Sequence, residues 1–266
     1  MTQTYPDHPN LNDNYAPLRM ECEVNDLIVE GEIPQDLYGS FYRNGPDPQF
    51  PPLGQYHWFG GDGMVHAFHF ENGKISYLNR WSKTSKWLQE RKAGKSLIDG
   101  LNPMNSDPQW NPEGSDGTAN TNIIFHAGKL LALEEGHVPF ELDPITLESK
   151  GAYDYGGKLK SPMTAHPKID PVSGDMYGFS YTAENFFSSK MSYFVINSVG
   201  ELKTYEEFEA PFASMVHDFM VTDQHIIFPI FPLTIDFDRV VKGQSPIAWD
   251  PDKGTHVGVM PRNGSV

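Results

Sequence analysis

Cysteine is nearly absent from the sequence, in which Cys22 is the single cysteine. An intrachain disulfide is therefore excluded, and so is a zinc site built from several thiolates. The chain also contains no HExxH motif and no cysteine-rich spacing that would mark a metal site locally. A metal ion would have to be held by side chains that are distant from one another in the sequence.

Long hydrophobic runs are lacking as well. No stretch approaches the roughly 18 consecutive apolar residues that a membrane-spanning helix needs. Residues 1–18 have neither the basic region nor the apolar region of a secretion signal. We therefore expect a soluble, cytoplasmic protein.

Basic residues are scarce: 20 Lys and Arg stand against 35 Asp and Glu, which gives a net charge of −15. Nucleic-acid backbones bind to clustered Lys and Arg, so this balance argues against a nucleic-acid partner. It also argues against broad electrostatic binding to an anionic membrane. Peripheral membrane contact through a local apolar patch stays open.

Glycine and proline are abundant, with 24 and 22 residues, as is typical of many short strands joined by turns. The clearest strand pair is residues 64–81, where two alternating runs flank Asn72-Gly73, a favoured pair for a type I′ hairpin turn. We predict one helix, at residues 84–96, with a Thr/Ser cap before good helix formers. From residue 121 onward the pattern predicts only strands.

The strand units recur at intervals of about 40–50 residues, which is typical of a β-propeller. We interpret residues 121–266 as about three blades and residues 64–81 as part of another. Residues 1–25 are expected to form an extended arm, and residues 26–266 an all-β, partial propeller domain. A β-sandwich is the alternative that the pattern leaves open.

Two histidines, His166 and His217, occupy matching places in consecutive strand units. Each precedes an apolar-alternating stretch, a polar turn and a further strand. The innermost strands of propeller blades start near the central axis, so these two imidazoles could meet at one ion. Two unrelated structural histidines are the alternative, because their spacing has no general meaning.

Five longer stretches resemble the carotenoid cleavage oxygenase family, in order along the chain from about residue 15 to the end. They are GEIPQDLYGSFYRNGP (31–46), YHWFGGDGMVHAFHF (56–70), TAHPKIDP (164–171), MVHDFMVTDQHIIFP (215–229) and AWDPDKGTHVGVMPR (248–262). The resemblance implies a seven-bladed β-propeller with a non-haem Fe(II) ion on its axis, held by four histidines and no carboxylate. It also implies cleavage of an alkene C=C bond with O₂ to give two carbonyl products. One branch of the family isomerises retinyl esters instead.

By this resemblance, His166 and His217 match two of the iron ligands. Glu135 matches a glutamate that accepts the remaining ring N–H of a ligand, and here we expect that ligand to be His217. Neutral imidazole suits Fe(II), and such a ligand normally donates its other N–H to a carboxylate or carbonyl. The family's two other ligands lie beyond its last motif found here, so we expect this chain to be the N-terminal part of a longer protein.

The substrate prediction also rests on the resemblance. The stilbene-cleaving branch grips the substrate hydroxyl with a tyrosine and a lysine, and the matching positions here are Leu101 and Glu134. Neither side chain can act in the same way, and Glu134 would repel a phenolate. Phe59 is expected to line the substrate tunnel, with a plain core role as the alternative.

We therefore predict an Fe(II)-dependent dioxygenase that uses O₂ to cleave an apolar alkene, a carotenoid or apocarotenoid, to aldehyde or ketone products. Three alternatives stay open at this point. They are a stilbene-cleaving dioxygenase of the same family, a non-catalytic propeller that serves as a binding platform, and a glycosidase built on a carboxylate pair.

Overall fold

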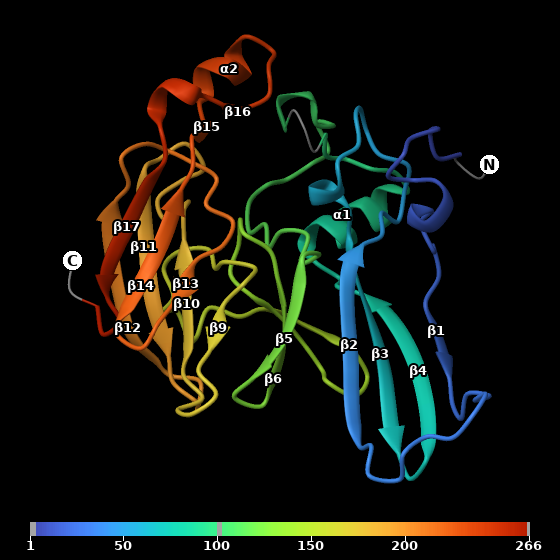
Figure 1. The fold of residues 1–266 in the computed structure, drawn as a ribbon. Helices are drawn as coiled ribbons and strands as arrows, with labels where there is room; N and C mark the ends of the chain where they lie inside the picture. The colour runs from blue at the N-terminus through green and yellow to red at the C-terminus, as the bar shows by residue number, and fades with distance from the viewer. Residues whose placement is uncertain (1–3, 100–102, 265–266) are drawn as a thin grey trace. The chain divides into compact units, whose positions relative to one another are not determined.

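The computed structural model of the protein describes residues 4–99 and 103–264, and its fold is dominated by β-sheets (Figure 1). One four-stranded sheet has the order β1-β4-β3-β2, with β1 (Cys22–Val24), β2 (Gly39–Pro46), β3 (Gly63–Glu71) and β4 (Lys74–Trp81). A second has the order β5-β6-β7-β8, with β5 (Asn122–His126), β6 (Lys129–Leu133), β7 (Phe140–Leu142) and β8 (Ser149–Ala152).

The remaining sheets lie later in the chain. A third four-stranded sheet has the order β12-β11-β10-β9, with β9 (Lys168–Ile169), β10 (Met176–Ser180), β11 (Lys190–Ile196) and β12 (Leu202–Glu209). A three-stranded sheet follows as β13-β14-β17, with β13 (Met220–Val221), β14 (His225–Ile230) and β17 (His256–Pro261). The strands β15 (Leu233–Ile235) and β16 (Ile247–Trp249) form a pair, and the two α-helices of the described chain are α1 (Ser85–Ala93) and α2 (Phe237–Val241).

The chain divides into two compact units. The N-terminal unit comprises residues 1–125, 129–132 and 140–151, and the C-terminal unit comprises residues 126–128, 133–139 and 152–266. Each unit has its own apolar core. Val65, Phe140 and Leu142 are buried in the first, and Phe179 and Phe228 are buried in the second. Val65 comes from β3, Phe140 and Leu142 from β7, Phe179 from β10 and Phe228 from β14, so each core is built from strand side chains.

The hairpin at residues 64–81 is confirmed. Strands β3 and β4 pair in antiparallel register with Glu71 opposite Lys74, and Asn72 and Gly73 form the turn between them. Both turn residues have positive φ, 51° and 73°, as a type I′ turn requires.

The helix expected at residues 84–96 is also confirmed, as α1. The Thr84 side chain accepts a hydrogen bond from the Trp87 backbone N–H, and Gly94 ends the helix with a left-handed φ of 71°. Helix α2 corrects the expectation of strands alone after residue 121. The Asp236 side chain caps α2 by accepting from the Asp238 N–H, and this helix is too short to produce a helical hydrophobic period.

The sheet-dominated class predicted from the sequence is confirmed, whereas the seven-bladed propeller stays a prediction. Of the residues expected as an extended arm, Cys22–Val24 form β1 and pair with β4. Within the described ranges, no helix has the length and apolar character needed to cross a membrane.

Gly178 in β10 offers a sharp test of the packing in the C-terminal unit. A Cβ added there would lie 2.3 Å from Cε2 of Phe194, a fully buried ring in β11. We expect Gly178→Ala to lower the free energy of unfolding by about 1–3 kcal/mol, the usual cost of overpacking, as measured by urea denaturation. Gly258→Ala in β17 is the matched control because its added Cβ would have its nearest neighbour at 3.7 Å. Equal losses in both variants would contradict this packing.

Candidate metal centre

The two predicted histidines come from two segments of the C-terminal unit. His166 lies just before β9, and His217 lies just before β13, so each histidine precedes a strand. The His166 backbone N–H donates to Thr164 Oγ1 at 3.0 Å, and the Thr164 N–H donates to the carbonyl of Phe179 at 2.8 Å. On the other segment, the neighbours of His217 include the buried Val216, which anchors the backbone in the core.

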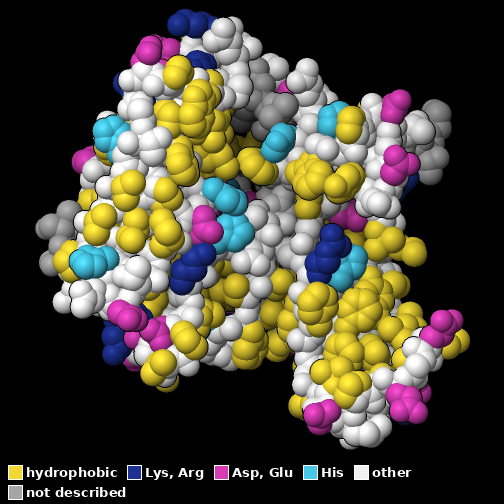
Figure 2. All heavy atoms as spheres, viewed as in Figure 1, with side chains coloured by type: hydrophobic (Ala, Val, Ile, Leu, Met, Phe, Trp, Pro, Cys, Tyr) yellow, Lys and Arg dark blue, Asp and Glu magenta, His cyan; other side chains and the backbone are white. Residues whose placement is uncertain are grey.

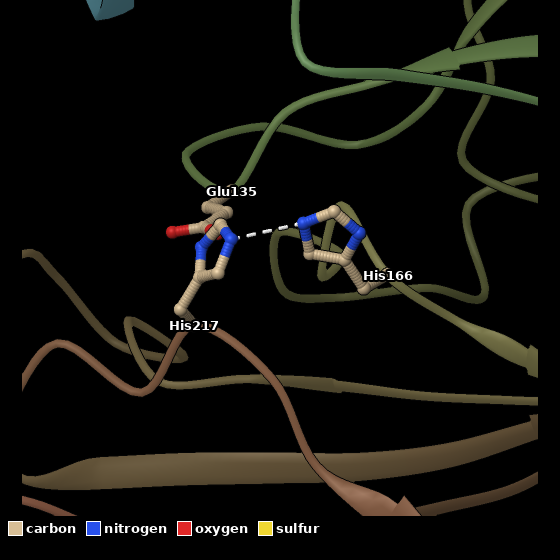
Figure 3. Close-up of side chains that lie close together, drawn as sticks. All are labelled: Glu135, His166 and His217. Atoms are coloured by element: carbon tan, nitrogen blue, oxygen red, sulfur yellow. Dashed lines mark hydrogen bonds and ion pairs between the residues drawn. The ribbon is translucent and has the colours of Figure 1, made fainter.

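The structure brings the two imidazoles together (Figure 3). The Nε2 atoms of His166 and His217 are 3.0 Å apart, and the rings lie edge to face with centroids 4.5 Å apart. Figure 2 shows histidine side chains beside an acidic and a basic side chain on this exposed face. The His217 side chain is 53% exposed, whereas that of Glu135 is only 14% exposed.

Glu135 contacts the His217 ring on the side away from His166, as the family resemblance implies. Its Oε1 contacts His217 Nδ1, and its Oε2 accepts a hydrogen bond of 2.6 Å from the Tyr181 hydroxyl. Burial raises the pKa of Glu135, while the hydrogen bond from Tyr181 and the nearby His217 act in the opposite direction. Ligand atoms from Glu135, His166 and His217 all lie within 4.8 Å of one another.

The surroundings of His166 favour its neutral form. Burial lowers the pKa of His166, and the neighbouring His217 lowers it further. A neutral imidazole is the form that binds a metal ion. Lys168 and Asp218 also connect the two histidine segments through an ion pair of 2.7 Å.

The donor set fits a divalent first-row metal ion. A metal–imidazole bond is about 2.0–2.1 Å long, as for zinc, so two imidazole nitrogens bound at right angles would stand about 2.8–3.0 Å apart. The observed Nε2–Nε2 separation is 3.0 Å. An N–H···N hydrogen bond between the two rings would have the same length. A metal-binding measurement distinguishes this hydrogen bond from a pair of metal ligands.

The sequence also predicts Phe59, Leu101 and Glu134 for the site. Phe59 lies in the N-terminal unit, where its side chain is 59% exposed and its ring contacts His57, so it does not belong to the core of that unit. The Glu134 carboxylate contacts Nδ1 of His137. Leu101 lies outside the described residues.

Sequence reasoning missed Tyr181 and the Lys168–Asp218 pair. Tyr181 lies 46 positions from Glu135, and the Lys168–Asp218 pair is 50 positions apart. No local pattern connects such residues, and only the folded sheets bring them into contact.

Comparisons with known proteins identify the family of the chain. The family model described as retinal pigment epithelial membrane protein, RPE65, matches residues 15–266. The chain therefore belongs to the RPE65/carotenoid cleavage oxygenase family.

Three individual relatives show how similar the chain is to named members of the family. The chain is 42% identical over 260 residues to isoeugenol monooxygenase of Pseudomonas nitroreducens, covering 96% of this chain and 54% of that protein. A crystal structure of lignostilbene dioxygenase from Pseudomonas brassicacearum superimposes with a TM-score of 0.93 at 40% identity, covering 99% of this chain and 55% of the other. Cobalt-substituted apocarotenoid oxygenase of Synechocystis gives a TM-score of 0.78 at 30% identity, covering 94% and 56%. The chain thus spans about half the length of the relatives that it matches.

Proposed function

We propose that this chain contributes two metal-ligating histidines, His166 and His217, to an oxygenase that cleaves an alkene C=C bond with O₂. The observation that carries the proposal is the pair of Nε2 atoms that face each other at 3.0 Å. The three relatives described above are named as a monooxygenase, a dioxygenase and an oxygenase, and these names support the same class of reaction. Fe(II) bound by these histidines would supply the means to activate O₂ for reaction with the alkene.

The residues around the pair suit this role. Glu135 faces Nδ1 of His217, so it favours the tautomer that carries its proton on Nδ1 and leaves Nε2 free to bind a metal. Thr164 fixes the backbone at His166 on the other side of the pair. These residues hold and orient metal ligands, and we assign none of them the role of an acid or a base.

Two substrate classes follow from the sequence and the comparisons. The carotenoid or apocarotenoid expected from the sequence is a prediction that the apocarotenoid oxygenase at 30% identity supports. An aryl alkene is the second candidate, because the relatives at 42% and 40% identity are named for isoeugenol and lignostilbene. The Glu134 carboxylate already contacts Nδ1 of His137, so one of its oxygens has a partner within the chain.

The two classes are separated by product analysis. The natural protein that carries these residues should be incubated with Fe(II), O₂ and either an apocarotenoid or a 4-hydroxystilbene, and the aldehydes should be identified by mass spectrometry. We expect cleavage of at least one class, with O₂ consumed in step with product. Retinyl-ester isomerisation without O₂ uptake, or no reaction with any alkene, would contradict the proposal.

A further inference from the structure

The hydroxyl of Tyr181 is a buried group that connects to the histidine pair through Glu135. Tyr181 follows β10, is 7% exposed and packs in the core of the C-terminal unit. Its hydroxyl donates to Glu135 Oε2 at 2.6 Å, while Oε1 of the same carboxylate contacts His217. The three side chains therefore form a line from the core to the imidazole.

We propose that Tyr181 is a positioning residue for the metal centre, whose hydroxyl holds the Glu135 carboxylate in the orientation that fixes the His217 ring. The inference rests on the proposed function, since it assigns the line of contacts to metal binding. Tyr181 acts through Glu135, the residue to which its hydroxyl donates.

Without its partners, the Glu135 side chain would be free to adopt several orientations. A Glu side chain has several rotatable bonds, and ordering it costs conformational entropy. Glu135 is held by contacts to both of its carboxylate oxygens, made by residues from two different segments. Because both oxygens make contacts, the orientation of the carboxylate is fixed. The carboxylate in turn fixes the direction in which Nδ1 of His217 points.

Loss of the hydroxyl would disturb this arrangement in a defined way. Without Tyr181, Oε2 would be a largely buried acceptor with no donor, which is unfavourable. The carboxylate would then rotate toward water or another donor, and the His217 ring would lose its fixed partner. Loss of a partner behind a metal ligand typically weakens metal binding 10- to 100-fold. Because Tyr181 acts through Glu135, we expect about a tenfold loss, at the low end of that range.

The chain offers a matched control for this test. Tyr177 lies in β10, the strand that Tyr181 follows, is equally buried at 7% exposure, and uses its hydroxyl to accept from Arg262 Nε at 3.0 Å. Tyr177→Phe therefore removes the same atom from the same sheet without touching Glu135. It reports how far a general loss of packing or stability affects metal binding.

The experiment measures the dissociation constant of Co²⁺, used as a spectroscopic probe, in the natural protein and its variants. We expect Tyr181→Phe to raise this constant about tenfold and to alter the visible absorption of bound Co²⁺, whereas Tyr177→Phe leaves both unchanged. In a Glu135→Ala background, Tyr181→Phe should have no further effect, because the intermediary is already gone.

Each other outcome is decisive. If the natural protein binds Co²⁺ and Tyr181→Phe binds it equally well, the positioning role is wrong while the proposed function stands. If both tyrosine variants weaken binding equally, the hydroxyl serves general stability, and the positioning role is again wrong. If the natural protein binds no metal ion, the proposed function fails and this inference fails with it.

Discussion

Replacing His217 by alanine should reduce the metal affinity of the natural protein by more than 100-fold and abolish alkene cleavage. Loss of an outer partner alone costs 10- to 100-fold, and removal of a ligand must cost more. His217 Nε2 is one of the two facing nitrogens at the candidate centre, so alanine removes one of its two imidazole ligands. His166→Ala should have the same effect for the same reason.

Metal content by atomic emission, measured beside thermal stability, checks this expectation. His225→Ala is the control, because His225 is an exposed histidine at the start of β14 and lies outside the cluster. Both ligand variants should stay folded, since each histidine is at least partly exposed. Unchanged metal content and cleavage in both ligand variants would contradict the assignment of the centre.

Replacing Lys86 by methionine should lower the free energy of unfolding by about 3–5 kcal/mol. Lys86 lies in α1 and bridges two buried carboxylates, with Nζ 2.8 Å from Asp62 and 2.9 Å from Glu90. Burial alone would lower the pKa of Lys86, but the charges of Asp62 and Glu90 outweigh it and raise the pKa above the ordinary lysine value. Removal of the lysine leaves two buried carboxylates without their counter-ion.

The pH dependence of this contribution has a definite sign. A lysine whose folded-state pKa is raised stabilises the fold fully below its unfolded pKa, and the contribution is lost as pH rises through the folded pKa. The stabilisation by Lys86 should therefore persist across the neutral range and disappear only in strong alkali. Denaturation by urea at neutral pH measures it.

Lys74→Met provides the matched control. Lys74 pairs with Asp26 at 2.6 Å, but both side chains are more than half exposed, so their pair should contribute only about 0–1 kcal/mol. A loss in Lys86→Met no larger than that in Lys74→Met would show that the buried cluster does not hold the N-terminal unit together.

Local chemistry made part of the fold predictable from the sequence. The turn at Asn72-Gly73 requires two positive φ angles, which these residues adopt readily, and Thr84 and Gly94 mark the ends of α1. Helix α2 escaped prediction because its cap, Asp236, precedes only five helical residues. A segment of that length carries no periodic signal.

The site was predictable in a different way. His166, His217 and Glu135 followed from a family resemblance, and the structure places them within contact of one another. Tyr181 and the Lys168–Asp218 pair depend on how β10, β9 and β13 pack, which no spacing in the sequence encodes. The substrate class was less predictable. It depends on side chains from separate units, Phe59 in the N-terminal unit and Glu134 in the C-terminal unit, and no spacing in the sequence relates them.

The central claim is that His166 and His217 hold a metal ion that alkene cleavage requires. The most direct test removes metal from the natural protein with a chelator, measures cleavage of an apocarotenoid and a 4-hydroxystilbene, and then restores Fe(II). The account predicts that cleavage of the accepted substrate stops on chelation and returns with Fe(II), and that it never returns in His166→Ala or His217→Ala. Cleavage that continues at its full rate in the metal-free protein, or that Fe(II) restores in both alanine variants, would contradict it.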